Sequence, residues 1–335
     1  MRGRIPDTAG MQPFLRRRRR ELYAEYPQRG EQALFERLAR AVNALQRRSA
    51  AGGPVSRGLH AKAIAVLHGE IRVRHDLPEE ARFGFLARGA RFPVVARFSG
   101  ASHKPTDEAV PDFYGLAIRI GDVAGEGKQD LVMTNKPRAT ARDAAGFKAL
   151  IDSTERGALP RLLFALRHPA TARLLLGARH PVASVANETY WSGDPIRWGP
   201  RVAKYLVKPA ANDAQSRPGA TGRYLSRDEL AAELRGRLSS ASVGFTLSLQ
   251  FQTDPYRTPI ENGLVLWSEE DAPPVPVADI EFEPQEFDTP ERREEGEGLE
   301  FSVWNCLDDS TPVGQLNRAR RAVYAASQRL RRGAD

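Results

Sequence analysis

A tyrosine near the C-terminus has an arginine on either side of it along one helical face. At about 100° per residue, Tyr324 and Arg331 fall within about 40° of Arg320 on a helix that begins near Pro312. A ferric ion bonded to a phenol oxygen would hold the phenol as phenolate, and a guanidinium one turn away would help. Arg331, two turns on, is suited to pair with a carboxylate. The spacing therefore indicates a tyrosinate ligand for iron.

The same pattern has a simpler explanation. Leu316, Val323 and Leu330 form an apolar stripe beside Tyr324, as in an amphipathic helix with a basic border. Tyr324 would then be only an interface aromatic. A ligand role needs a matching group on the other side of the iron.

Earlier segments supply such groups. They contain side chains suited to proton transfer and anion binding: Arg57-Gly-Leu-His60-Ala-Lys62, Arg97-Phe-Ser99, Leu131-Val-Met-Thr134-Asn135-Lys-Pro137, and Arg142-Asp143 followed by Phe147. In this order, together with the C-terminal Arg-x-x-x-Tyr pattern, they resemble the catalase superfamily. The run from Pro312 to Arg331 is similar to the ending of its short haem-binding members. The resemblance covers roughly residues 54–332 and rests on the order of the motifs rather than on any one of them.

The resemblance implies roles on the distal side of a haem b group. His60 matches the histidine that shuttles a peroxide proton, and Ser99 matches the serine that orients it. The family's catalytic asparagine is the first of an adjacent pair, and a gapless match places Thr134 there and Asn135 second. We expect Asn135 to be the amide donor and keep Thr134 as the alternative.

The resemblance also implies the groups that hold the haem. Tyr324 would be the proximal iron ligand, with Arg320 as its charge partner. The remaining residues that match haem contacts are three propionate-binding arginines and a phenylalanine over the ring: Arg57, Arg97, Arg331 and Phe147.

Several positions depart from the family pattern. Two adjacent phenylalanines of large catalases are Ala139 and Thr140 here, which predicts a wider or more polar approach to the haem. Ala326 and Ser327 replace the aspartate–threonine pair that follows the tyrosine. The chain ends at Asp335, so we expect no C-terminal helical domain. These departures favour a peroxidase over a fast hydrogen-peroxide dismutase.

The expected function is therefore a haem-dependent peroxidase of organic peroxides and hydrogen peroxide, with weak catalase activity. Its partners would be a peroxide substrate and a small organic electron donor. Three alternatives remain open: rearrangement of fatty-acid hydroperoxides on the same fold, haem binding without turnover, and a basic nucleic-acid-binding module. The His60–Ser99 pair argues against a pure carrier, which needs no acid–base group. The nucleic-acid alternative rests only on charge and on the basic run Arg16–Arg20, so we expect no nucleic-acid partner.

The amino-acid composition excludes several other classes of protein. The 335 residues contain 50 Lys and Arg, 42 Asp and Glu, and one cysteine, Cys306. A single cysteine excludes an intramolecular disulfide framework and multi-cysteine metal centres. No apolar run approaches the roughly 18 residues that cross a bilayer, and no targeting signal is evident. We therefore expect no integral membrane association and a cytoplasmic protein, for which a homo-oligomer is compatible with the sequence.

The elements that must position these residues form an α+β fold. Short apolar runs between turn residues predict an antiparallel β-barrel, surrounded by helices, over 54–335. Residues 1–53 predict a basic helical arm outside it, with helical spacing from Glu31 to Leu45. Residues 143–176 also have a helical pattern. Their leucines are predicted to be core residues: Leu162, Leu163, Leu166 and Leu174–Leu176.

Overall fold

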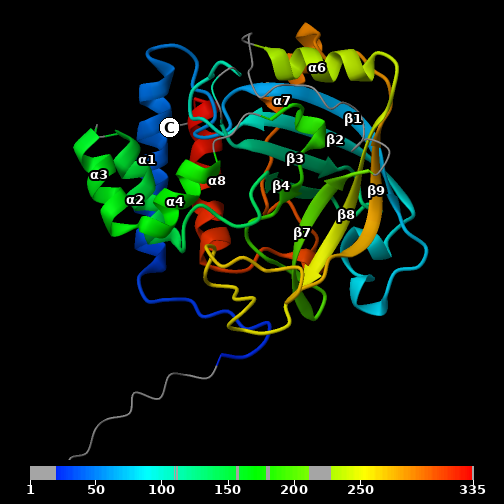
Figure 1. Ribbon diagram of the computed structural model, residues 1–335, viewed down its shortest axis with the longest axis horizontal. Helices are drawn as coiled ribbons and strands as arrows, with labels where there is room; N and C mark the ends of the chain where they lie inside the picture. The colour runs from blue at the N-terminus through cyan, green and yellow to red at the C-terminus, as the bar shows by residue number, and fades with distance from the viewer. Residues whose placement is uncertain are drawn as a thin grey trace, which may run out of the picture.

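The computed structural model is built around a closed antiparallel β-barrel (Figure 1). It describes residues 20–333 except 109, 111, 156–157, 179–181 and 211–227. The sheet order is β5-β4-β3-β2-β1-β9-β8-β7-β6, and an additional β5–β7 pairing closes eight of these strands into a ring. The strands are β1 (Ala63–Val73), β2 (Arg91–Gly100), β3 (Tyr114–Ile120), β4 (Gln129–Thr134), β5 (Tyr190–Trp191), β6 (Ile196–Trp198), β7 (Arg201–Pro209), β8 (Val243–Phe251) and β9 (Val275–Phe282). The prediction of an α+β barrel is confirmed.

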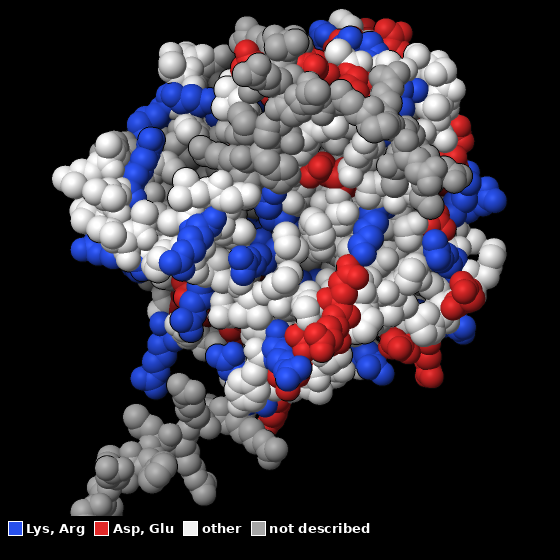
Figure 2. Space-filling model, in the orientation of Figure 1, with Lys and Arg blue, Asp and Glu red and all other residues white. Residues whose placement is uncertain are grey.

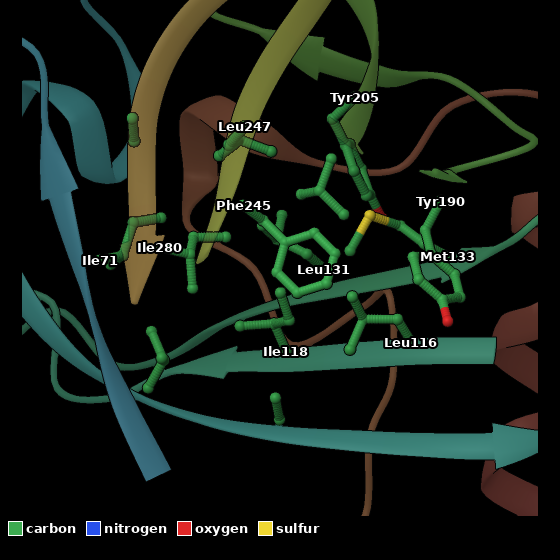
Figure 3. Packing of buried hydrophobic residues seen from close by; sticks show 14 of the residues in the cluster. Ile71, Leu116, Ile118, Leu131, Met133, Tyr190, Tyr205, Phe245, Leu247 and Ile280 are labelled. Carbon is green, nitrogen blue, oxygen red and sulfur yellow. The ribbon is translucent and has the colours of Figure 1, made fainter. Parts of the chain in front are cut away.

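Alternation along the strands gives the barrel its interior. In β3, Leu116 and Ile118 are completely buried inside, whereas Ala117 between them lies on the outer face and is partly exposed. The interior side chains of β4, Leu131 and Met133, pack against these residues and against side chains from β7, β8 and β9 (Figure 3). The barrel is therefore filled by side chains, and any site must lie on its outer face or at its rim.

Helices lie outside the barrel. In the described part of the chain they are α1 (Glu31–Ala50), α2 (Ala144–Glu155), α3 (Ala158–Arg167), α4 (Pro169–Ala178), α6 (Glu229–Leu238), α7 (Pro290–Gly298) and α8 (Gln315–Arg331). The expected N-terminal and C-terminal helices are both present. None of the helices described is long and apolar enough to span a membrane.

The N-terminal helix packs on the C-terminal one. Phe35 and Val42 of α1 share a buried cluster with Ile151 of α2 and Val323 of α8 (Figure 1). On α8 the cluster includes Ala319, Val323 and Ala326, and Tyr324 packs at its edge. Of the basic run Arg16–Arg20, only Arg20 falls among the described residues.

The leucines predicted as core residues in α3 and α4 are largely outside the core. Leu162, Leu166 and Leu176 are 58%, 70% and 80% exposed, and Leu163 is also exposed, whereas Leu174 and Leu175 are partly exposed. That part of the prediction was wrong. A helical period shows that leucines share a face, but it does not show which face is covered.

Candidate functional site

His60 lies just before β1, in a constrained backbone. Its φ of 57° is in the left-handed region, which is uncommon for a residue with a side chain. Its N–H donates to the carbonyl of Ala101 at 3.2 Å, and its own carbonyl accepts from Arg97 Nη1 at 3.0 Å. Arg97 Nη2 also donates to the carbonyl of Ala61 at 3.2 Å. These bonds to the adjoining segments fix the direction in which the histidine ring projects.

The imidazole of His60 occupies a gap above a glycine. Its Nδ1 lies 3.1 Å from Ser99 Oγ on β2. A Cβ on Gly115 of β3 would lie 2.5 Å from both Cε1 and Nδ1 of the ring, so only glycine leaves room for it. No described residue hydrogen-bonds to Nε2 of His60, so this nitrogen remains available.

The surroundings of His60 favour its neutral form. Burial is the main cause, and the positive charges of Arg97, Arg320 and Arg57 act in the same direction against the opposing effect of Asp112. Together they lower the pKa of His60 to about 4. Above that pH the ring is a neutral proton acceptor.

Strand register places Thr134 on the same outer face as Ser99. Gly115 pairs with Ser99 of β2 on one side and with Thr134 of β4 on the other. Directly opposite residues in a sheet share a face, so Ser99, Gly115 and Thr134 form one row beneath the His60 ring. The next row across the same strands includes Ala117 and Val132, both small and partly exposed.

Asn135 does not lie in that row. Its Oδ1 accepts a hydrogen bond from the Tyr114 N–H, and its Nδ2 donates to Glu188 Oε2, both at 2.9 Å. The amide is therefore buried, and both its oxygen and its nitrogen are hydrogen-bonded at the end of β4. The geometry favours Thr134 over the expected Asn135 as the side chain near His60.

Three of the predicted arginines converge on Glu297, in α7. Arg57 Nη1 forms an ion pair with its Oε2 at 2.8 Å, and Arg97 Nη2 lies 3.9 Å from Oε1. Arg331 donates to the carbonyl of Glu297. Arg57 also donates to the carbonyls of Gly296 and Leu299, both at 2.7 Å.

The cluster carries more positive than negative charge. Burial, followed by the charge of Arg57, lowers the pKa of Arg97 to about 9, and Arg97 Nε is buried without a hydrogen-bond partner. Burial also lowers the pKa of Arg57, although Glu297 opposes this shift. The three guanidinium groups outnumber the nearby carboxylates of Glu297 and Glu300, so the site is suited to further anionic groups.

The face of α8 next to its apolar stripe holds Tyr324 and Arg320. Arg320 Nη1 donates to Asn317 Oδ1 at 2.9 Å, and its Nη2 lies 3.2 Å from the buried Asp194 Oδ2. Burial alone would lower the pKa of Arg320, but Asp194, Tyr324 and Tyr205 outweigh it and raise that pKa. The guanidinium therefore remains charged beside the Tyr324 phenol.

This face of α8 points toward the barrel. Tyr324 and Arg320 both influence the pKa of Tyr205, which burial raises, and the hydroxyl of Tyr205 is bonded to backbone atoms of Val132 in β4. Arg320 also helps to lower the pKa of His60. Charged and polar groups from the two ends of the sequence thus lie near β3 and β4.

Phe147 is placed differently from the other predicted residues. It lies on α2 and packs, like Tyr324, at the edge of the cluster formed by α1, α2 and α8. It is therefore on the helical side of the site, away from the bonds that hold His60.

Comparisons with known proteins agree with this arrangement. Residues 53–162 match the family model described as Catalase. The structure of a fungal catalase aligns with a TM-score of 0.68 at 17% identity, over 86% of this chain and 61% of that one. This chain has the catalase fold, and about a third of it, residues 53–162, matches the Catalase family model.

Two further catalases show the same likeness. A bacterial catalase aligns at a TM-score of 0.64 and 19% identity, over 100% of this chain and 68% of that one. Catalase A from Saccharomyces cerevisiae aligns at 0.66 and 18%, over 93% and 67%. The chain thus spans 61–68% of the length of these catalases. A search of curated proteins found no match.

The sequence analysis missed three residues of the site. Gly115 makes room for His60, Glu297 balances the arginine cluster, and Asp194 pairs with Arg320. Only Gly115 left a signal, because a glycine inside an apolar strand often marks the close approach of another group. The other two partners depend on contacts between distant segments.

The side chains of this catalase fold suit a haem. A half-buried phenol with a charged guanidinium beside it matches the donor set of a tyrosinate ligand. The surplus charge of Arg57, Arg97 and Arg331, with the unpartnered Nε of Arg97, matches two carboxylates at the ring edge. On the outer face of the barrel, Ala117 and Val132 are paired and stay partly exposed.

Proposed function

We propose that this protein is a haem-dependent peroxidase that reduces organic peroxides and hydrogen peroxide, with weak catalase activity. One observation carries the proposal: a neutral imidazole, His60, is held by Ser99 above an outer barrel face toward which α8 turns Tyr324 and Arg320. A protein that only carries haem has no need of a fixed proton acceptor there.

His60 would move the proton of the peroxide. With its Nδ1 proton donated to Ser99 Oγ, the lone pair of Nε2 accepts the proton from the first peroxide oxygen. His60 then returns that proton to the second oxygen, which leaves as water or as an alcohol. Over a full turnover, the peroxide, two electrons and two protons give an alcohol (or water) and water. Haem, when bound, would supply the two electrons that break the oxygen–oxygen bond, and an organic donor would return two electrons and two protons, which release the first oxygen as water.

The other residues would hold the haem and define its surroundings. Tyr324 would be the iron ligand, and Arg320, fixed by Asp194 and Asn317, would stabilise its phenolate. The arginine cluster would bind the propionates. Thr134 can donate only one hydrogen bond where the family has an amide, which supports peroxidase chemistry over rapid dismutation.

An absorption spectrum tests the haem, and a variant series tests the roles. Protein produced with added haem should show a Soret band, and a colourless protein would refute the proposal. His60→Ala should retain the band and lose peroxide turnover by roughly 100-fold or more, whereas the exposed His75→Ala should match wild type. Tyr324→Phe should weaken haem binding or shift the spectrum; an unchanged spectrum excludes Tyr324 as the ligand.

Product analysis separates the peroxidase from a hydroperoxide-rearranging enzyme that would use the same residues. A lipid hydroperoxide is supplied with and without an organic electron donor. The proposal expects donor-dependent formation of the alcohol. Complete conversion to isomeric products without a donor would instead assign the rearrangement.

A further inference from the structure

We propose that α3 and α4 form a docking surface for a bilayer that contains anionic phospholipid. The surface is defined by five exposed leucines: Leu159, Leu162, Leu163, Leu166 and Leu176, with exposures between 41% and 80%. Contiguous exposed apolar side chains of this kind mark sites of interaction with proteins or membranes.

The leucines of α3 share one face of the helix. At about 100° per residue, Leu162, Leu163 and Leu166 fall within about 60° of Leu159. Phe164, the one residue of α3 that is buried, lies on the opposite side and stacks on His168 at 4.7 Å. The helix is therefore anchored through Phe164, and the leucine stripe faces away from the protein.

The charge around this stripe has one sign. Residues 156–187 include five arginines and no aspartate or glutamate. Of these arginines, Arg167 and Arg173 are exposed and form no ion pair with a described residue. In Figure 2, the surface over α3 at the left of the molecule is mostly white, with blue at its margins and no red.

The exposed leucines and the surrounding arginines together indicate which partner binds this surface. Exposed leucines bordered by arginines are typical of helices that lie in the interface of a membrane, where apolar burial and attraction to anionic lipid act together. A second copy of the chain is a poorer match. A two-fold contact would bring each stripe against its own equivalent, with arginines facing arginines and no aspartate or glutamate within residues 156–187 to compensate them. At 10 residues, α3 is too short to cross a bilayer, so docking would be parallel to the surface.

Vesicle sedimentation tests the inference with the full-length protein. Vesicles of phosphatidylcholine alone are compared with vesicles that also contain phosphatidylglycerol. The test variant is Leu162→Ser/Leu166→Ser, and the matched control is Leu22→Ser/Leu266→Ser, which changes two exposed leucines outside α3 and α4. A third variant, Arg167→Glu/Arg173→Glu, tests the charge.

Wild type should bind the phosphatidylglycerol vesicles, and raised salt should weaken binding. The test variant should lose about tenfold or more of its partition coefficient, while the control stays within about twofold of wild type. The charge variant should lose the preference for anionic vesicles. Absence of wild-type binding at low salt would overturn the inference, as would equal binding by the test variant.

Sedimentation velocity tests whether a second copy of the chain, rather than a membrane, binds this surface. A wild-type dimer that becomes monomeric in Leu162→Ser/Leu166→Ser, without vesicle binding, would assign the surface to self-association and overturn the proposal. The assay uses no peroxide and does not need haem. Failure of the proposed peroxidase function would therefore leave this result unaffected, and the reverse also holds.

Discussion

Replacing Gly115 by alanine should inactivate the protein without unfolding it. The new Cβ would lie 2.5 Å from two atoms of the His60 ring and 3.1 Å from Ser99 Oγ. Favourable carbon contacts begin near 3.5 Å, so the ring must move by about 1 Å. The hydrogen bond between His60 and Ser99, now 3.1 Å, would be lost or misdirected.

Gly115→Ala should reduce turnover far more than it reduces stability. Overpacking costs about 1–3 kcal/mol, but the ring is at the end of a movable side chain, and alanine is favoured over glycine in a strand by roughly 0.5–1 kcal/mol. The net loss of stability should therefore be about 2 kcal/mol or less. A misplacement of about 1 Å in a catalytic group can reduce turnover by roughly 100-fold.

The assay is peroxide turnover per haem-loaded molecule, with urea unfolding measured in parallel. Gly121→Ala is the control, because a Cβ there would meet its nearest neighbour, an atom of Pro93, at an ordinary 3.8 Å. The control should retain turnover within about twofold of wild type. If Gly115→Ala retained more than half of the wild-type turnover, the assignment of His60 as the proton-transfer residue would be refuted.

The remaining predictions concern pH and two partner residues. Because burial lowers the pKa of His60 to about 4, the imidazole of the haem-free protein should stay neutral below the ordinary histidine pKa and become protonated only as the pH approaches 4; an NMR titration of His60 centred near 6.5 would contradict this. The unfolded chain then binds the extra proton between these values, so stability should decrease as the pH falls from about 6.5 to 4. Asn135→Ala should lower the free energy of unfolding by about 1–3 kcal/mol and leave turnover per folded molecule unchanged. Asp194→Asn removes the charge that pairs with Arg320 and should shift the absorption spectrum of the haem-loaded protein; an identical spectrum would exclude that influence.

The hydrophobic pattern within single segments was sufficient to predict the strands and the two terminal helices. The helical spacing from Glu31 to Leu45 predicted α1, and the short apolar runs between turn residues predicted the strands of the barrel. Both depend on a period within one segment, which the sequence displays directly. The backbone of His60 was not predictable in this way, because its left-handed φ is held by a hydrogen bond from Arg97 and by one that its own N–H donates to Ala101, residues far along the chain.

The sequence alone could not decide whether Thr134 or Asn135 lies near His60. Their order in the chain does not say which one faces the outer side of the barrel. That depends on the register of β4 against β3, which pairs Thr134 with Gly115. The leucines of α3 pose the same problem, since the covering of a helical face is decided by other segments.

The anion site and the proton acceptor are physically coupled in this structure. Arg97 holds the carbonyl of His60 and also lies 3.9 Å from Glu297, so one buried guanidinium belongs to both groups. Its charge and that of Arg57 contribute to the low pKa of His60. Carboxylates bound at the cluster would neutralise part of that charge and so raise the pKa of His60 toward its ordinary value. Occupancy of the arginine cluster by the proposed haem propionates would therefore make the imidazole a stronger base, and so would increase the readiness of His60 to accept a proton.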